Sequence, residues 1–267
     1  MVETLTILIA IALYILLIIL LTKQATGNSA RNTIDKYFTL GVIALALHGY
    51  VCFKAIYNAN GLLLGFFPVA ALISWFIAAT TLIGSLRIAI DKLLIPLYAL
   101  AALTLLAMLL FPQIDGTPTK VSPGISAHII FSILAYSILT IAACQAVALW
   151  LQNHALKSHQ VGGIIKVLPP LQTMEEMLFQ MITSGTVLLA GSIITGAIFL
   201  DDIFAQYLAH KTVFSITALV IFSVLLWGRY QNGWRGTVAI RWTLIGFAAL
   251  MLGYFGSKFV LELILQK

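Results

Sequence analysis

The sequence predicts an all-α membrane protein, a polytopic bundle of eight transmembrane helices in a single domain over residues 1–267. Three observations support this fold class. Hydrophobic residues make up 61% of the chain and charged residues only 9%, against about 25% charged residues in an ordinary soluble domain. The mean hydropathy is +1.04. Eight apolar stretches approach the roughly 20 residues that a transmembrane helix needs. A soluble enzyme, a disordered chain and a nucleic-acid binder are therefore not expected.

The eight predicted spans cover residues 4–22, 37–57, 66–86, 93–111, 126–151, 177–199, 212–228 and 238–262. The first span is not expected to be a cleaved signal peptide, because its apolar run is long and follows Glu3 rather than basic residues. The longest connection, residues 152–176, contains Pro169 and Pro170. Thr173 precedes Glu176 by three residues, which predicts a capping box that opens the sixth helix.

Lysine and arginine counts predict the orientation, because cytoplasmic loops of membrane proteins carry an excess of these residues. One set of loops holds ten of them: Lys23, Arg31, Lys36, Arg87, Lys92, Lys157, Lys166, Arg229, Arg235 and Arg241. The opposite side holds five: Lys54, Lys120, Lys211, Lys258 and Lys267. We therefore expect both termini on the outer, periplasmic side. This distribution also accounts for the basic pI without a nucleic-acid partner.

His48 lies near the middle of the second predicted span. Burying an imidazole in the hydrocarbon region is costly, so the ring is expected to have a partner. One interpretation is a single hydrogen bond to a hydroxyl or carbonyl on a neighbouring helix. The other is an axial ligand to a metal or haem iron. The remaining histidines outside the fifth span, His154, His159 and His210, are expected in loops.

A polar stripe marks the start of the fifth span. His128, Ser132 and Tyr136 are spaced by four residues and so share one helical face. This face must contact protein or a cavity, because lipid offers no hydrogen-bond partners. The stripe is either a polar seam that joins two helices or a ligand with polar neighbours lining a pocket.

The segment from Trp227 to Gly236 joins the last two spans on the predicted inner face. Gly233 and Gly236 permit a tight turn, and Trp234 suits the aromatic belt at a membrane interface. Arg235 could hold an anionic headgroup or a carboxylate. An anchored turn with no ligand is an equally good interpretation of these residues.

Motifs of enzymes and transporters are missing from the sequence. It contains no GxSxG, HExxH or P-loop motif. The acidic residues lie at the ends of spans or in loops, whereas proton-coupled transport usually needs a carboxylate inside the membrane. We therefore expect a protein without catalytic turnover.

The order of several short motifs resembles that of a known family. His128 opens a helix that continues through Ala135-Tyr136, and Thr195-Gly196 follows near the outer end of the next helix. A Gly233-Trp234-Arg235-Gly236 turn and a late Phe255-Gly256 complete the pattern. The chain thus resembles the cytochrome c assembly protein superfamily of CcsA/CcmC/HemX-like haem-handling proteins. It is most similar to the short, eight-span, YpjD-like branch, over about residues 120–260.

This resemblance implies a bacterial inner (cytoplasmic) membrane protein that binds or handles haem, with haem b as cofactor. It implies His128 and His48 as metal ligands, and a cofactor site that also includes Tyr136, Trp234 and Arg235. His48 is expected deep in the membrane and His128 near its outer surface, which favours two separate sites or one structural histidine over a shared haem. The expected partners are the lipid bilayer, haem and another inner-membrane protein. The alternative function is a membrane scaffold or regulatory partner that keeps the fold without haem.

The chain departs from the family in one segment. The haem handlers carry a tryptophan-rich outer segment that ends in Trp-Asp, but residues 199–212 contain no tryptophan. Acidic residues, Phe204, Tyr207 and the His210-Lys211 pair remain. The resemblance therefore implies a haem site within the bundle rather than a delivery platform on the outer face.

Overall fold

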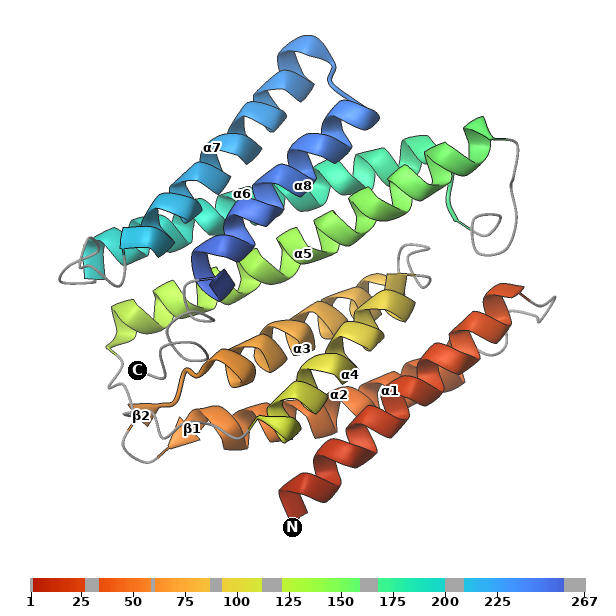
Figure 1. Ribbon diagram of the computed structural model, residues 1–267, viewed down its shortest axis with the longest axis vertical. Helices are drawn as coiled ribbons and strands as arrows, with labels where there is room; N and C mark the ends of the chain where they lie inside the picture. The colour runs from red at the N-terminus through yellow and green to blue at the C-terminus, as the bar shows by residue number, and fades with distance from the viewer. Residues whose placement is uncertain are drawn as a thin grey trace. The chain divides into compact units, whose positions relative to one another are not determined.

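The computed structural model describes residues 2–26, 34–58, 61–86, 93–111, 122–158, 168–199 and 209–256. These described residues form eight α-helices, as predicted: α1 (Val2–Thr26), α2 (Ile34–Ile56), α3 (Phe66–Gly84), α4 (Leu94–Leu110), α5 (Pro123–Lys157), α6 (Leu171–Phe199), α7 (Ala209–Asn232) and α8 (Thr237–Met251) (Figure 1). Seven of them are long and apolar enough to cross a membrane, and α4 is shorter, with 17 residues. The all-α membrane bundle is thereby confirmed.

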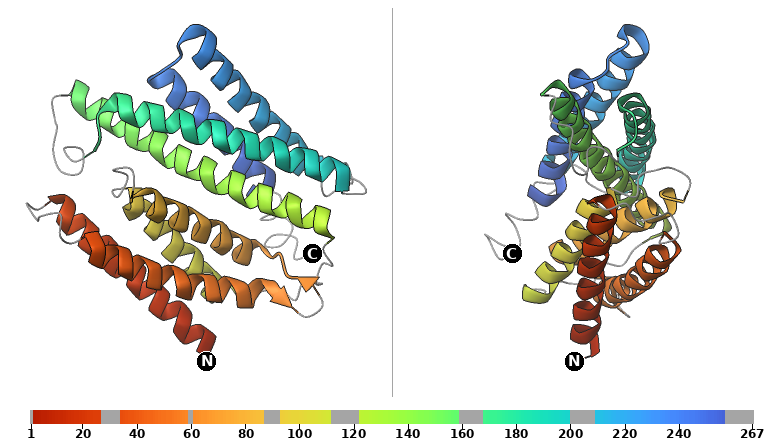
Figure 2. Two further views of the ribbon diagram at one scale, coloured as in Figure 1. Left: turned by 180° about the vertical axis from the view of Figure 1, so that it is seen from behind. Right: turned by 90° about the vertical axis from the view of Figure 1, so that its right-hand side faces the viewer.

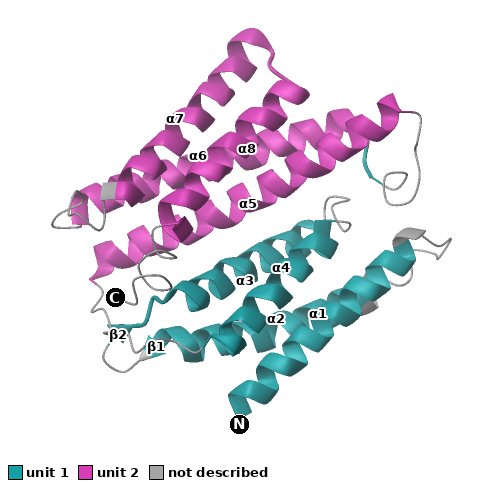
Figure 3. Ribbon diagram, in the orientation of Figure 1, with its two compact units in different colours: residues 1–120, 159–169 teal, residues 121–158, 170–267 magenta. Residues whose placement is uncertain are grey.

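The chain divides into two compact units, shown in Figure 3. Unit 1 comprises residues 1–120 and 159–169, and unit 2 comprises residues 121–158 and 170–267. Within each unit, helices that follow one another in sequence pack together, and the first helix also packs against the fourth. Helices α1–α4 thus form one closed four-helix arrangement and α5–α8 form another. That residues 1–267 make a single domain stays a prediction.

Unit 1 has an apolar core with a few polar contacts between its helices. Tyr14 and Leu17 of α1 are fully buried in this core. The hydroxyl groups of Ser74 on α3 and Thr104 on α4 lie 2.7 Å apart. Trp75 donates its indole N–H to the carbonyl oxygen of Leu45 on α2, at 2.7 Å. Such bonds supplement van der Waals packing between helices that lipid would otherwise surround.

Unit 2 is organised around the long pair of α5 and α6, which run side by side in Figure 2. Helix α5 begins sharply because Ser122 caps it, accepting a hydrogen bond from the Ile125 N–H at 3.3 Å, and a proline follows at the first helical position. Gly185 of α6 lets the two backbones approach, since an added Cβ would lie 2.6 Å from Cδ2 of Leu139 on α5. Leu139 of α5 and Gly185 of α6 are therefore in direct contact.

Helices α5 and α6 extend further than the sequence predicted. Because α5 continues to Lys157, His154 is helical, and its ring stacks on that of Trp150 at a centroid distance of 6.0 Å. Because α6 begins at Leu171, Thr173 lies inside the helix, and the predicted capping box is wrong. Pro170 ends the preceding segment instead, and its carbonyl oxygen accepts the Met174 N–H at 3.1 Å. Hydropathy marks only the part of a helix that lies in hydrocarbon, whereas the helix itself continues into polar surroundings.

Three smaller features also differ from the prediction. A short antiparallel hairpin, β1 (Tyr57–Asn58) and β2 (Gly61–Leu62), connects α2 and α3. At the end of α8 the chain continues as a π-helical turn over Leu252–Gly256. His210, expected in a loop, is an exposed residue in the first turn of α7.

Candidate functional site

His48 is held by a hydroxyl group of a neighbouring helix. Its Nδ1 atom lies 3.0 Å from the hydroxyl oxygen of Tyr14 on α1. The two rings meet edge to face, with centroids 5.7 Å apart. Tyr14 in turn packs against Tyr98 of α4, at a centroid distance of 5.2 Å. One of the two interpretations of His48, an interhelical hydrogen bond, is therefore realised in unit 1.

The other ring nitrogen of His48 is unusual because it is buried and unpaired. The whole residue has no solvent-exposed surface, and Nε2 forms no hydrogen bond within the described residues. The backbone of Ala71 on α3 lies close to the ring but not in the geometry of a hydrogen bond. The unpaired nitrogen is thus enclosed by packed side chains and has no room for a planar macrocycle in this conformation.

His128 is held by the main chain of α6. Its Nδ1 atom lies 2.8 Å from the carbonyl oxygen of Ser192. Because a carbonyl oxygen can only accept, Nδ1 must donate its proton in this bond. In the neutral imidazole the lone pair then resides on Nε2. The residue is half-buried, so part of its surface is open to the surroundings of unit 2.

The rest of the polar stripe faces neighbouring helices, as its position on α5 predicts. The hydroxyl groups of Ser132 and Ser192 lie 2.7 Å apart. Tyr136 is buried and donates its hydroxyl proton to the carbonyl oxygen of Leu250 on α8, at 2.8 Å. Its ring also meets that of Tyr254 in the π-helical turn, at a centroid distance of 5.9 Å. The stripe therefore joins α5 to both α6 and α8.

The turn between α7 and α8 is built on glycine and tryptophan. Trp234 packs so closely on Gly228 that any side chain there would overlap the indole ring. The Trp234 N–H donates to the Gly228 carbonyl oxygen at 3.2 Å, and its own carbonyl oxygen accepts from the Arg229 guanidinium, also at 3.2 Å. Gly233 and Gly236 both have positive φ, at 64° and 58°, the conformation that favours glycine. The tight turn predicted from the sequence is present.

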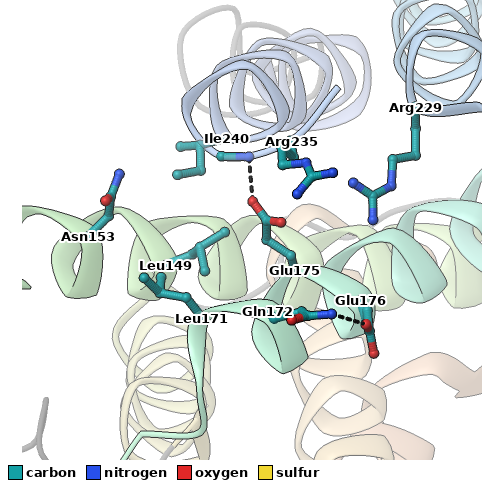
Figure 4. A pocket seen from close by; sticks show the side chains of 10 residues that line it. Leu149, Asn153, Leu171, Gln172, Glu175, Glu176, Arg229, Arg235 and Ile240 are labelled. Atoms are coloured by element: carbon teal, nitrogen blue, oxygen red, sulfur yellow. Dashed lines mark hydrogen bonds between the residues drawn. The ribbon is translucent and has the colours of Figure 1, made fainter. Parts of the chain in front are cut away.

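A pocket of about 300 Å³ lies beside this turn and is drawn in Figure 4. Its lining comes from all four helices of unit 2: Leu149, Asn153, Leu171, Gln172, Glu175, Glu176, Arg229, Arg235, Gly236 and Ile240. The carboxylate of Glu175 on α6 accepts a hydrogen bond from the Gly236 N–H, which fixes the turn against α6. The guanidinium of Arg229 lies 4.6 Å from the ring centroid of Phe179.

Within unit 2, the four residues predicted to bind a cofactor do not converge: His128 and Tyr136 are separated from Trp234 and Arg235. His128 and Tyr136 lie in the half of α5 that begins the helix, whereas Arg235 contributes to the pocket that includes Asn153 near its end. The 25 residues from His128 to Asn153 span roughly 37 Å of α-helix. His48 belongs to the other unit. Within the described ranges, no group of three His, Cys, Asp or Glu side chains could hold a metal ion.

Sequence reasoning missed two partners that the fold brings in. Tyr14, which contacts His48, was visible only as a single polar ring in an otherwise apolar first span. Nothing in the sequence around Glu175 indicates its partner, yet its carboxylate accepts a hydrogen bond from a main-chain N–H 61 residues away. The tryptophan-free segment compared with the family's haem-delivery platform falls largely on residues 200–208, outside the described residues.

Comparisons with known proteins agree with this architecture. The model of the family described as cytochrome C assembly protein matches residues 37–265. The chain is 32% identical over 225 residues to the inner membrane protein YpjD of Escherichia coli (strain K12), which covers 84% of this chain and 85% of that protein. It is 24% identical over 233 residues to protein HemX of Brevibacillus brevis, covering 82% and 83% of the two chains. No solved structure matches significantly.

These matches extend over both units. The family model begins in α2 and continues past α8, and the alignment with YpjD spans more than four fifths of each chain. Together with the apolar helices, they identify a multi-pass protein of the inner membrane. The resemblance first seen in the histidine, tyrosine and turn motifs is thereby confirmed: the chain belongs to the cytochrome c assembly protein family.

Proposed function

We propose that this protein binds haem b in the inner membrane and carries or senses it without catalytic turnover. The observation that supports this function best is the hydrogen bond between Nδ1 of His128 and the carbonyl oxygen of Ser192. Metal-ligating histidines commonly donate their second N–H to a carbonyl or carboxylate, which orients the ring and makes the free nitrogen more basic. Nε2 of His128 thus retains its lone pair for a ligand, and it belongs to a residue that is only half-buried.

His128 and His48 differ in how well they suit this role. His128 combines a fixed tautomer with partial exposure at the end of unit 2 that we assign to the periplasmic side. His48 has an unpaired Nε2, but the packing around its fully buried ring must open before a porphyrin could reach it. We therefore propose that His128 would hold the haem iron and that His48 makes a structural hydrogen bond. When bound, haem would supply an iron that accepts the imidazole lone pair.

Absorption spectroscopy of the detergent-purified protein tests the proposal. The protein would be expressed with ample haem or incubated with haem b, then measured in the oxidised and reduced states. We expect a Soret band in the wild-type protein and its loss in His128→Ala. His154→Ala, which removes another histidine of α5 near its opposite end, is the matched control and should keep the band.

Two outcomes would refute this assignment. A wild-type protein that stays colourless and takes up no haem excludes the function itself. A Soret band that survives in His128→Ala but disappears in His48→Ala moves the ligand into unit 1, which would then have to open around the imidazole. The variants are compared only if circular dichroism shows that they retain the helix content of the wild type.

A second function is favoured by a different observation. The polar groups of the bundle largely satisfy one another: Tyr14 pairs with His48, Ser132 with Ser192, and Tyr136 with a main-chain carbonyl. A core in which these polar groups pair with one another suits a scaffold or regulatory partner of another inner-membrane protein. Crosslinking in intact membranes should then capture one constant partner, and capture should be unchanged in His128→Ala. A protein that crosslinks to no constant partner would contradict this second function.

A further inference from the structure

The pocket of unit 2 lies where four helix ends meet, at the opposite end of α5 from His128. Helices α5 and α7 end beside it, and α6 and α8 begin there. The first N–H groups of a helix have no partners within the helix, and the aligned peptide dipoles give the helix start a partial positive charge. The two helix ends carry the opposite partial charge, so the helix dipoles largely cancel at this space and its electrostatic character is set by the side chains that line it.

Two arginines add full positive charges to this space. Figure 4 shows the guanidinium groups of Arg229 and Arg235 extending toward the same region above Glu175. Arg229 is partly engaged by the ring of Phe179 and the carbonyl oxygen of Trp234. Arg235 makes no hydrogen bond or ion pair with any residue that the structure describes. A guanidinium in this position retains all its donors for an anion, and its planar fork matches two phosphate oxygens.

The same pocket contains negative charge, which restricts the kind of anion it accepts. Glu175 is occupied by the Gly236 N–H. Glu176 is exposed, and its contact within the described residues is a 3.4 Å hydrogen bond from the side chain of Gln172. A polyphosphate or dicarboxylate would be repelled by the two glutamates. A group with one negative charge and a nearby cation matches the arginines and Glu176 together.

The surroundings of the pocket indicate which kind of molecule carries such a charged group. Its floor includes the buried apolar residues Leu149 and Ile240. On α7, close to Arg229, Trp227 and Tyr230 are exposed, with 60% and 86% of their surfaces accessible. Exposed aromatic residues of this type gather at the headgroup level of membranes. The volume of about 300 Å³ is at the lower limit for small-molecule sites and suits a headgroup rather than a whole lipid.

We propose that this pocket binds the headgroup of a zwitterionic phospholipid, with the phosphodiester between Arg229 and Arg235 and the primary ammonium group on the carboxylate of Glu176. The site is independent of any haem site at His128, from which it is separated by most of the length of α5. It fixes the start of α6 and the turn before α8 to the lipid surface at one end of unit 2.

Lipid binding to the purified, delipidated full-length protein tests the proposal. Short-chain phosphatidylethanolamine, phosphatidylglycerol and inorganic phosphate would be titrated separately, with tryptophan fluorescence as the readout. We expect phosphatidylethanolamine to bind at least about tenfold more tightly than phosphatidylglycerol. Arg235→Gln should weaken its binding by about tenfold or more, the equivalent of one lost hydrogen bond to a charged group.

Two further variants separate the roles of the charges. Glu176→Gln should remove the preference for phosphatidylethanolamine over phosphatidylglycerol while both lipids still bind. Arg241→Gln changes an exposed arginine of α8 that does not line the pocket, so it serves as the matched control and should bind like the wild type. Arg235 is the better test than Arg229, because it holds no other part of the described fold in place.

The results that would overturn the proposal are specific. Equal affinities of the wild type and Arg235→Gln for phosphatidylethanolamine would mean that the pocket holds no phosphate. Inorganic phosphate that binds as tightly as the lipid would identify a soluble phosphate compound as the ligand. A preference for phosphatidylethanolamine that persists in Glu176→Gln would remove the ammonium subsite.

Discussion

Replacing Gly228 with alanine should destabilise the turn between α7 and α8. The new Cβ would lie 2.7 Å from Cζ3 of Trp234 and even closer to Cε3 and Cδ2. Carbon atoms pack best at about 3.5–4.0 Å, so the indole must move by roughly 1 Å or more. The indole packs on the ring of Trp242 at a centroid distance of 5.6 Å. The main chain of Trp234 is hydrogen-bonded to the Gly228 carbonyl oxygen and the Arg229 guanidinium. A shift of the indole therefore disturbs these contacts.

The expected cost follows from this geometry. Overpacking of a rigid contact typically costs about 1–3 kcal/mol. A glycine in the open interior of a helix gains about 0.5–1 kcal/mol when it becomes alanine. Gly191 of α6 provides this control, since its added Cβ would meet Phe131 at an ordinary distance of 3.5 Å. Gly228→Ala should therefore be at least about 1 kcal/mol less stable than Gly191→Ala.

The assay is reversible unfolding in mixed micelles, followed by tryptophan fluorescence and circular dichroism. Because Arg235 directly follows Trp234, Gly228→Ala should also weaken phosphatidylethanolamine binding, whereas Gly191→Ala should leave it unchanged. Equal stabilities of the two alanine variants would refute the reasoning, since they would mean that Trp234 does not pack on Gly228 in the membrane protein.

Three further substitutions address the polar contacts, each measured by the same unfolding assay. Tyr14→Phe deprives the buried His48 ring of its hydroxyl partner and should cost about 1–3 kcal/mol; a neutral result would mean that the ring has another partner. Tyr136→Phe removes a donor to the Leu250 carbonyl oxygen and should cost about 0.6 kcal/mol, with an upper limit near 1.7; a larger loss would contradict this limit. Ser192→Ala removes the hydroxyl contact with Ser132 but keeps the main-chain carbonyl that orients the ring of His128. The free energy of unfolding should therefore fall only slightly, and any Soret band should persist.

Much of the architecture followed from composition and short motifs. Eight apolar stretches predicted eight helices, because a chain with so few charges can only satisfy its main chain in lipid by forming helices. The glycines of the α7–α8 turn predicted a tight connection, because positive φ at Gly233 and Gly236 is costly for other residues. The order of motifs from His128 to Gly236 indicated the family before any helix was placed.

Tertiary structure decided which residues meet. In a membrane protein the faces toward lipid and toward other helices are both apolar, as exposed Leu103 and Val187 illustrate, so the sequence pattern does not distinguish them. The bond from Glu175 to Gly236 joins residues 61 positions apart, and that from His128 to Ser192 joins residues 64 positions apart. Only helix packing brings such groups together. The sequence could thus predict that these polar side chains need partners in an apolar medium, and the fold supplied the partners.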